Sequence, residues 1–431
     1  MLVHGHRIIR EITTFNTGTQ TGVKKEFGKC TFSAIRRRIC ENSYSLESLS
    51  LRHAPGMKFP VQALPYPFLF FLLIGAVSPA SGDKIDDAIQ TEMKNRGIPG
   101  LSLAIVQNGQ PMKIQAYGSA NLEHQVSTRI ETSYCIASIT KQFVATGIML
   151  LVAEGKLSLE DSPAKYLDNL PTQWKNITLR QMLSHTSGII DVENDLPTVA
   201  DTVTMLAFDY TDEELLDLAK KRPLNFNPGE KYSYSNTGFH MSGMIIKKLT
   251  GKNWGAFLKE RIFDPLEMEN TRINRLDEIV PHRASGYWIV SRDIVVNGPP
   301  VSPSMMAYAA GGLRSTVIDL MKWDAALDSG KILNLKQLQQ MWQPTPLNNG
   351  TTTPYGLGWS VKDYNGQRMI SHSGGRESGY STYMAKFPDH RLTIILLTNQ
   401  YNGASPRDLA KTIVELVLPQ LAAEPTDFRE K

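Results

Sequence analysis

The chain has 431 residues, of which 41% are hydrophobic and 20% charged, so its composition is that of a globular protein and excludes a disordered or fibrous one. The formal net charge of +4 comes from the N-terminus: residues 1–56 hold nine Lys/Arg and four Asp/Glu, whereas residues 83–431 hold 36 basic and 38 acidic residues. A body of balanced charge lacks the basic surface that polyanions require, and we expect no nucleic-acid partner.

Residues 57–82 have the layout of a secretory signal peptide, with one lysine, an apolar run over 68–77 and small residues before residue 83. The run is about half of the roughly 18 residues that a membrane-spanning helix needs. We therefore expect cleavage, no stable membrane anchor, and a secreted or periplasmic protein; an uncleaved signal that anchors the chain is the alternative. Residues 1–56 are predicted to be a dispensable extension, either an unused upstream start or a basic targeting arm.

The rest of the chain predicts an α/β (α+β) domain over 83–421, followed by a tail at 422–431. Neighbouring strands in the sequence favour hairpins, and hence an antiparallel sheet. The sheet should be flanked by helices and built from both chain ends, with a mostly helical lobe inserted at about 140–345. The predicted elements are a helix over 83–96, strands over 101–106, 113–117, 356–361, 367–371, 381–387 and 391–398, and a helix over 405–421.

The cysteines and histidines give no pattern of a metal or disulfide site. Cys135 is the one cysteine beyond residue 82, so no disulfide can form within the predicted domain. The nine histidines include no H-E-x-x-H pair and no Cys/His cluster at ligand spacing. We expect neither a metal nor another cofactor.

The first motif that carries chemistry is Ser138-Ile139-Thr140-Lys141, at the start of a helix predicted over 143–154. A three-residue spacing places the hydroxyl and the amine on one helical face, about one turn apart. A serine is a weak nucleophile until a neighbour takes its proton, which a buried lysine with a lowered pKa can do. The helix N-terminus favours the developing negative charge. Taken alone, a surface pair whose serine caps the helix would explain the motif better.

The second motif is Tyr234-Ser235-Asn236, after a loop marked by Pro228-Gly229. In an extended segment, alternation would point Tyr234 and Asn236 to the same side. A phenol can relay protons to a leaving group when nearby cations lower its pKa, and an amide can hold a substrate carbonyl. The structural alternative is a buried tyrosine beside an asparagine turn.

The third motif, His372-Ser373-Gly374-Gly375, follows the predicted strand over 367–371. Glycines on a strand allow another backbone to approach, here that of a substrate along the sheet edge. Taken alone, a turn at the end of the strand would explain the motif better.

In this order, the three motifs resemble the serine β-lactamase and penicillin-binding-protein superfamily, of which S-x-x-K is a signature. The tyrosine of the second motif resembles class C β-lactamases and their relatives, the D-aminopeptidases, D-alanyl-D-alanine carboxypeptidases and β-lactamase-like esterases. The resemblance extends from about Ile85 to Leu418 and includes the segments 184–188 and 311–316, in which we expect structural roles. His185 in particular should be a packed, hydrogen-bonded residue. The resemblance implies a β-lactamase/transpeptidase-like fold.

The resemblance also implies the catalytic roles. Ser138 would be the acylated nucleophile and Lys141 its proton acceptor. Tyr234 would relay protons in acylation and deacylation, coupled to the lysine.

At the positions that face the substrate, Asn236 would contact an amide and His372 would lie beside the substrate. The backbone N–H groups of Ser138 and Gly375 would form the oxyanion hole. The sequence departs from β-lactamases in having His-Ser-Gly where they carry K-T-G, a form that resembles D-aminopeptidases and esterase relatives. A histidine of ordinary pKa is mostly neutral at pH 8, so carboxylate-bearing β-lactams should react poorly there and better below about pH 6.5.

The sequence thus favours a serine hydrolase that acts on a small peptide, amide or ester, in the manner of a D-aminopeptidase, a carboxypeptidase or an esterase. A true β-lactamase and a non-catalytic binding or regulatory protein of the same fold are the alternatives. An α/β-hydrolase esterase is disfavoured because its G-x-S-x-G motif is absent from the sequence. The sequence does not determine the oligomeric state.

Overall fold

The computed structural model describes residues 79–195, 205–403 and 405–421, and every structural statement below concerns these residues. They belong to one unit of the chain, Ala76–Lys431. The predicted extension, most of the predicted signal peptide and the tail lie outside the described residues. Within the described part, no helix is long and apolar enough to cross a membrane.

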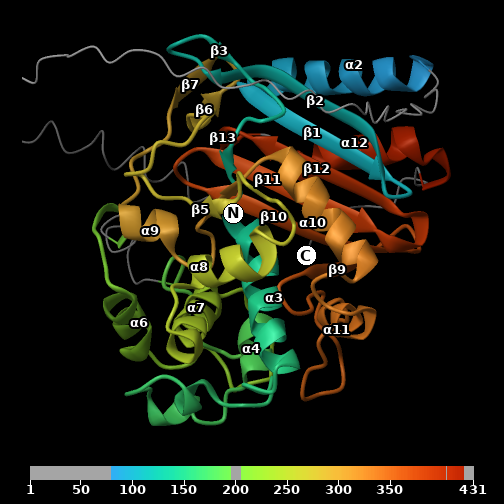
Figure 1. The fold of residues 1–431 in the computed structure, drawn as a ribbon. Helices are drawn as coiled ribbons and strands as arrows, with labels where there is room; N and C mark the ends of the chain where they lie inside the picture. The colour runs from blue at the N-terminus through green and yellow to red at the C-terminus, as the bar shows by residue number, and fades with distance from the viewer. Residues whose placement is uncertain (1–78, 196–204, 404, 422–431) are drawn as a thin grey trace, which may run out of the picture. The chain divides into compact units, whose positions relative to one another are not determined.

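A seven-stranded antiparallel sheet joins the first three strands of the described chain to four strands from its C-terminal part (Figure 1). The strand order is β3-β2-β1-β12-β11-β10-β9, and β1 pairs with β12 from Leu101 opposite Thr398 to Gln107 opposite Leu392. This confirms the prediction of a sheet built from both chain ends. The strands are β1 (Gly100–Gln107), β2 (Gln110–Asn121), β3 (Val126–Ser127), β9 (Ser360–Tyr364), β10 (Gln367–Arg376), β11 (Tyr380–Phe387) and β12 (Leu392–Thr398).

Helices cover both faces of this sheet, which explains the unbroken apolar run Ile394–Leu397 in its central strand β12. Ile394 and Leu396 of β12 pack in the core beneath helices α2 (Pro79–Arg96) and α12 (Pro406–Val417). Ile395 packs in the opposite core, with the helical lobe. Successive side chains of a strand point to opposite faces, so a strand covered on both sides carries an unbroken apolar run.

The chain between the strands β3 and β9 forms the predicted lobe, which is mostly helical, as expected (Figure 1). Its central helix α3 (Thr140–Ala153) is apolar on nearly every side and buried along almost its whole length. The other helices are α4 (Leu179–Leu183), α6 (Asp212–Lys220), α7 (Asn236–Thr250), α8 (Trp254–Leu258), α9 (Pro303–Ala307), α10 (Val317–Ser329) and α11 (Leu335–Met341).

Two small sheets accompany the large one, and the sequence did not predict them. One has the strand order β4-β8-β5 and the other β13-β6-β7. Most of these strands are too short to show a clear alternation of apolar and polar residues. They are β4 (Tyr134–Cys135), β5 (Arg272–Ile273), β6 (Tyr287–Ser291), β7 (Ile294–Asn297), β8 (Leu313–Ser315) and β13 (Gln400–Tyr401).

Some predicted boundaries are wrong. The first helix begins at Pro79, four residues before its predicted start. The strand predicted over 356–361 begins only at Ser360, as β9. The preceding segment bends instead, because Gly358 has a φ of +77° and packs so closely on α3 that a Cβ would lie 2.7 Å from the Lys141 carbonyl oxygen. The third motif lies inside β10 and not after it.

Candidate active site

Ser138 lies in a single turn of 3-10 helix, η2 (Ala137–Ile139), that leads directly into α3. The sheet holds the chain just before this turn, because Thr382 on β11 donates its hydroxyl hydrogen to the Ile136 carbonyl oxygen at 2.9 Å. Ala137 has a φ of +47°, in the left-handed region that residues other than glycine rarely adopt. Such strain persists where the surroundings enforce it, often at active sites. The strained turn presents the half-buried Ser138 at the head of α3.

Lys141 follows one turn later on α3, and its side chain is buried. Its Nζ lies 3.0 Å from Ser138 Oγ, 2.7 Å from Asn236 Oδ1 and 2.6 Å from the Ala310 carbonyl oxygen. The predicted proximity of hydroxyl and amine is thus found. Burial lowers the pKa of Lys141 to about 7, although nearby carboxylates act in the opposite direction. Near neutral pH, a large fraction of the side chain is therefore an uncharged amine that can accept a proton.

Tyr234 precedes α7, and its ring centroid lies 4.9 Å from Lys141 Nζ. Burial raises the pKa of the phenol well above 10, and its hydrogen bond with Ser138 offsets this only in part. The lowered pKa that would favour proton relay by a phenol is therefore not found at Tyr234. The phenol stays protonated at neutral pH and is able to donate its proton to a neighbouring atom.

His185 packs against the ring of Tyr234, with centroids 4.1 Å apart. It is buried, and its Nδ1 accepts a hydrogen bond from the backbone N–H of Ser235 at 3.1 Å. This is the packed, hydrogen-bonded setting that the sequence predicts for His185. The imidazole therefore supports the tyrosine and has no contact with Ser138 that would suggest a catalytic role.

Asn236 is the first residue of α7. Its amide is therefore positioned by the start of a helix, whereas the sequence predicted an extended segment at this point. Its Oδ1 faces Lys141, and its Nδ2 donates to Glu193 Oε2 at 2.7 Å and to Asp191 Oδ2 at 3.1 Å. Sequence reasoning missed both acids. A pair of carboxylates directly after the apolar Ile189-Ile190 is the signal that could have found them.

A buried ion pair continues from these acids to the end of β10. Arg376 Nη1 lies 3.2 Å from Glu193 Oε1, and the guanidinium also donates to the Met305 carbonyl oxygen. Burial opposes the charge of Arg376, but Glu193 and Tyr308 raise its pKa overall. A fixed cation therefore partly balances the carboxylates near the lysine.

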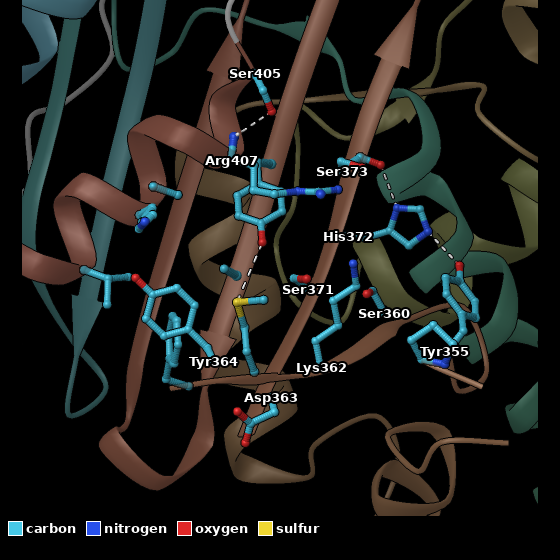
Figure 2. Close-up of a pocket in the computed structure, with 18 of the residues that line it drawn as sticks. Tyr355, Ser360, Lys362, Asp363, Tyr364, Ser371, His372, Ser373, Ser405 and Arg407 are labelled. Carbon is cyan, nitrogen blue, oxygen red and sulfur yellow. Dashed lines mark hydrogen bonds between the residues drawn. The ribbon is translucent and has the colours of Figure 1, made fainter. Parts of the chain in front are cut away.

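His372 lies on β10 with both ring nitrogens engaged (Figure 2). Its Nδ1 is 2.6 Å from the Ser373 carbonyl oxygen and its Nε2 is 2.6 Å from the hydroxyl of Tyr355, a residue that sequence reasoning missed. Because a carbonyl oxygen only accepts, Nδ1 carries the hydrogen and Nε2 accepts from the tyrosine. Burial, together with the charge of Lys141, lowers the pKa of His372 to about 3. The imidazole ring lies 6.4 Å from the ring of Tyr234, between ring centroids, and it is neutral.

The third motif also forms an open strand edge beside Ser138. β9 pairs with β10 only as far as Ser360 opposite Ser371, so no strand in the described chain covers this edge of β10 from His372 onward. A Cβ at Gly374 would lie 2.3 Å from the Ile136 carbonyl oxygen. Gly374 therefore admits the segment before η2, whereas the sequence analysis expected it to admit a substrate backbone. The uncovered edge, which includes Gly375, is still where an extended substrate can pair.

A cavity of about 710 Å³ opens beside this edge, between β9, β10 and the start of α12 (Figure 2). Tyr234 and His372 line one part of it. The cations Lys362 from β9 and Arg407 and Lys411 from α12 line it, and the carboxylate residues Asp363 and Asp408 also belong to its wall. Most of the remaining wall is aromatic or aliphatic: Tyr232, Pro354, Tyr355, Tyr364, Met369, Tyr383, Ala385, Phe387, Ala410 and Val414.

Comparisons with known proteins agree with this fold. The family model described as Beta-lactamase matches residues 85–418. Penicillin-binding protein 4* of Bacillus subtilis (strain 168) is 31% identical over 338 residues, which cover 75% of this chain and 73% of that protein. D-amino acid amidase from Ochrobactrum anthropi SV3, solved in complex with L-phenylalanine amide, superposes with a TM-score of 0.69 at 26% identity, covering 79% of this chain and 99% of that one. The octameric penicillin-binding protein homologue from Pyrococcus abyssi superposes with a TM-score of 0.66 at 27% identity, covering 78% and 77%.

Proposed function

The chain belongs to the Beta-lactamase family, and from this premise we propose that it is a serine hydrolase that forms an acyl-enzyme on Ser138. Membership of a fold does not by itself establish a reaction. The observation that carries the proposal is the 3.0 Å contact between Ser138 Oγ and Lys141 Nζ, made by a buried lysine whose pKa is lowered to about 7. This pair supplies the nucleophile and the base that acyl transfer needs.

In the proposed acylation, Ser138 Oγ attacks the acyl carbon while Lys141 accepts its proton. The backbone N–H groups of Ser138 and Gly375 donate to the oxyanion. Tyr234 gives its phenol proton to the departing nitrogen or oxygen and regains one from Lys141. In deacylation, water attacks the ester carbon, the lysine and tyrosine pair accepts a proton from that water, and Ser138 leaves with a proton from the same pair.

The substrate class that this site fits is a small amide, a short peptide or an ester. Tyr234 is hydrogen-bonded to Ser138 and also lines the cavity, whereas Ser138 and Lys141 do not line it. A leaving group protonated by the tyrosine would therefore reach the cavity only by extending past the tyrosine. The aromatic wall suits an apolar or aromatic group. One relative is named D-amino acid amidase and was solved with an amino-acid amide, which supports amides as the first substrates to test.

A β-lactamase is the second candidate. The observation in its favour is that Lys362 and Arg407 line the cavity beside the third motif, where they could attract the carboxylate of a β-lactam. The neutral His372 disfavours it, because the third motif itself then supplies no cation. A non-catalytic binding protein remains the third alternative, and it would leave Ser138 unreactive.

A substrate panel tests these proposals. The panel would contain D- and L-phenylalanine amide, a p-nitrophenyl ester, a peptide ending in D-alanyl-D-alanine and a chromogenic cephalosporin, each assayed with wild type and Ser138→Ala. We expect turnover of at least one amide, peptide or ester, and its loss in the variant. A kcat/KM for the cephalosporin above that of every other substrate would replace the proposal with a β-lactamase. Binding of a panel member without turnover would support the non-catalytic alternative.

A further inference from the structure

Asp191 is a buried carboxylate that the proposed mechanism leaves without a role. Its side chain is 1% exposed, and its segment is fixed against the start of α7. Ser235 donates its hydroxyl hydrogen to the Ile190 carbonyl oxygen at 3.1 Å, and the backbone N–H of Val192 donates to Thr237 Oγ1 at 3.1 Å. These two bonds hold the carboxylate against the amide of Asn236.

The acids determine which end of this amide faces the lysine. Burial raises the pKa of Asp191 to about 7, so above neutral pH its side chain is a carboxylate, whose oxygens only accept hydrogen bonds. Asp191 and Glu193 then both require the NH₂ group of Asn236 on their side. The carbonyl oxygen Oδ1 must then face Lys141, as observed at 2.7 Å. The orientation of the amide is thus a consequence of the two carboxylates.

This orientation in turn directs the lone pair of the lysine. An uncharged amine has two N–H groups and one lone pair. Lys141 Nζ has two neighbours that can only accept from it, Asn236 Oδ1 and the Ala310 carbonyl oxygen at 2.6 Å. They take both N–H groups and leave the lone pair for the third neighbour, Ser138 Oγ. A reversed amide would donate to the lysine and occupy the lone pair that the serine needs.

We propose that Asp191, together with Glu193, is a positioning residue that fixes the amide of Asn236 and so directs the lone pair of Lys141 at Ser138. The inference rests on the proposed acyl transfer at Ser138. It assigns the two acids a function through Asn236 and no contact with the reacting atoms.

A purely electrostatic role of Asp191 would have a different signature. The charges that act on Lys141 are those of Asp191 and Glu193, which raise its pKa, and of Arg376, which lowers it. The other titratable neighbours are uncharged near neutral pH: Tyr234, His185 and His372. Loss of the Asp191 charge would therefore lower the pKa of the lysine and move the acidic limb of the rate profile to lower pH. An electrostatic role alone leaves the high-pH plateau unchanged, whereas a positioning role also lowers the plateau.

The test is the pH profile of kcat/KM for a neutral p-nitrophenyl ester in Asp191→Asn, because the new amide can donate to a reversed Asn236. We expect the plateau to fall about 10- to 100-fold, within the range of a misaligned general base, and the limb to move to lower pH. The matched control is Asp195→Asn. Its carboxylate lies in the same segment but accepts from the backbone N–H of Asp191 and from Asn225, so we expect a change below about twofold.

A double variant shows whether Asp191 acts through Asn236. In an Asn236→Ala background, Asp191→Asn should cost no further activity, since the amide through which it acts is gone. The proposal is overturned if the plateau of kcat/KM in Asp191→Asn equals that of wild type. It is also overturned if Asp191→Asn lowers the plateau by the same factor in the Asn236→Ala background as in wild type. If Asp191→Asn does not fold, Glu193→Gln carries the same test, and an unchanged plateau there overturns the proposal equally.

Labelling with a fluorophosphonate separates this inference from the proposed function. A wild type that the probe does not label contradicts the proposed function itself. A wild type that is labelled, with Asp191→Asn labelled at the same rate, contradicts only the positioning role. We expect labelling of Asp191→Asn to be slowed by the same factor as ester turnover.

Discussion

The reactivity of Ser138 depends on the protonation of one buried lysine. As an ammonium ion, Lys141 donates to all three of its oxygen neighbours and cannot accept the serine proton. As an uncharged amine, it keeps a lone pair for Ser138. Because burial lowers its pKa to about 7, the basic form increases as the pH rises through 7 and is lost below it.

The first prediction concerns this lysine. For a neutral ester, kcat/KM should rise with pH to a plateau, with a midpoint near pH 7. Because burial also raises the pKa of Asp191 to about 7, this midpoint reports the titration of Lys141 and Asp191 as a coupled pair. Lys141→Met should lower the plateau at least about 100-fold. Lys156→Met, just beyond α3, is the control and should match wild type. Activity of Lys141→Met within about tenfold of wild type would reject the lysine as the base.

The second prediction concerns His372. The sequence suggested that this histidine becomes charged below about pH 6.5, whereas in the structure it stays neutral to much lower pH. With its pKa lowered to about 3, the imidazole gains no charge between pH 8 and pH 5. The ratio of kcat/KM for a carboxylate-bearing substrate to that for a neutral ester should therefore show no step near pH 6.5. His372→Lys should raise this ratio at pH 7. A step near pH 6.5 that disappears in His372→Gln would show that the histidine does become charged there.

At the scale of elements, sequence patterns predicted long helices and strands well and short or bent ones poorly. The apolar run over Ile394–Leu397 predicts a buried strand, and the long run of mostly apolar residues in α3, ended by Gly155, predicts a buried helix. The bend at Gly358 depends on a contact with α3 that no local pattern reveals. The same holds for the site. Ser138 and Lys141 lie three residues apart, on η2 and at the start of α3, and were predictable, whereas Asp191 reaches them only through the tertiary fold.

The third prediction tests the packing of β10 against the turn that carries the serine. Gly374→Ala should destabilise the protein by about 1–3 kcal/mol, because its Cβ would meet the Ile136 carbonyl oxygen at 2.3 Å. Gly375→Ala is the matched comparison on the next residue, where the nearest atom lies 3.3 Å away on the ring of Tyr401, and it should cost less. Thermal melts of both variants decide between them. Equal melting temperatures for Gly374→Ala and wild type would contradict this packing.

At the scale of the whole molecule, the site exists only because both chain ends meet in one sheet. The serine comes from η2, the lysine from the start of α3, the asparagine from α7 and the third motif from β10. The resemblance in the sequence anticipated this assembly. It could not anticipate the hydrogen bond between Tyr355 and His372, because this bond joins the segment before β9 to the uncovered edge of β10.

The fourth prediction concerns the residues before the domain. We propose that residues 57–82 direct secretion or export to the periplasm, and that the active protein needs nothing before α2. The buried apolar residues of the two described cores begin at Ile85. A chain that starts at Pro79 should therefore match the full-length protein in melting temperature and ester turnover. A truncated chain that is insoluble or inactive, beside an active full-length protein, would contradict the dispensability of this region.

The most direct test of the account is to locate the covalent adduct. Wild type, Ser138→Ala and Lys141→Met would be treated with a fluorophosphonate at pH 8, digested and mapped by mass spectrometry. The account predicts one modified residue, Ser138, in wild type, no adduct in Ser138→Ala, and labelling slowed at least about 100-fold in Lys141→Met. An adduct on another residue, or an unlabelled wild type that is folded, would contradict it.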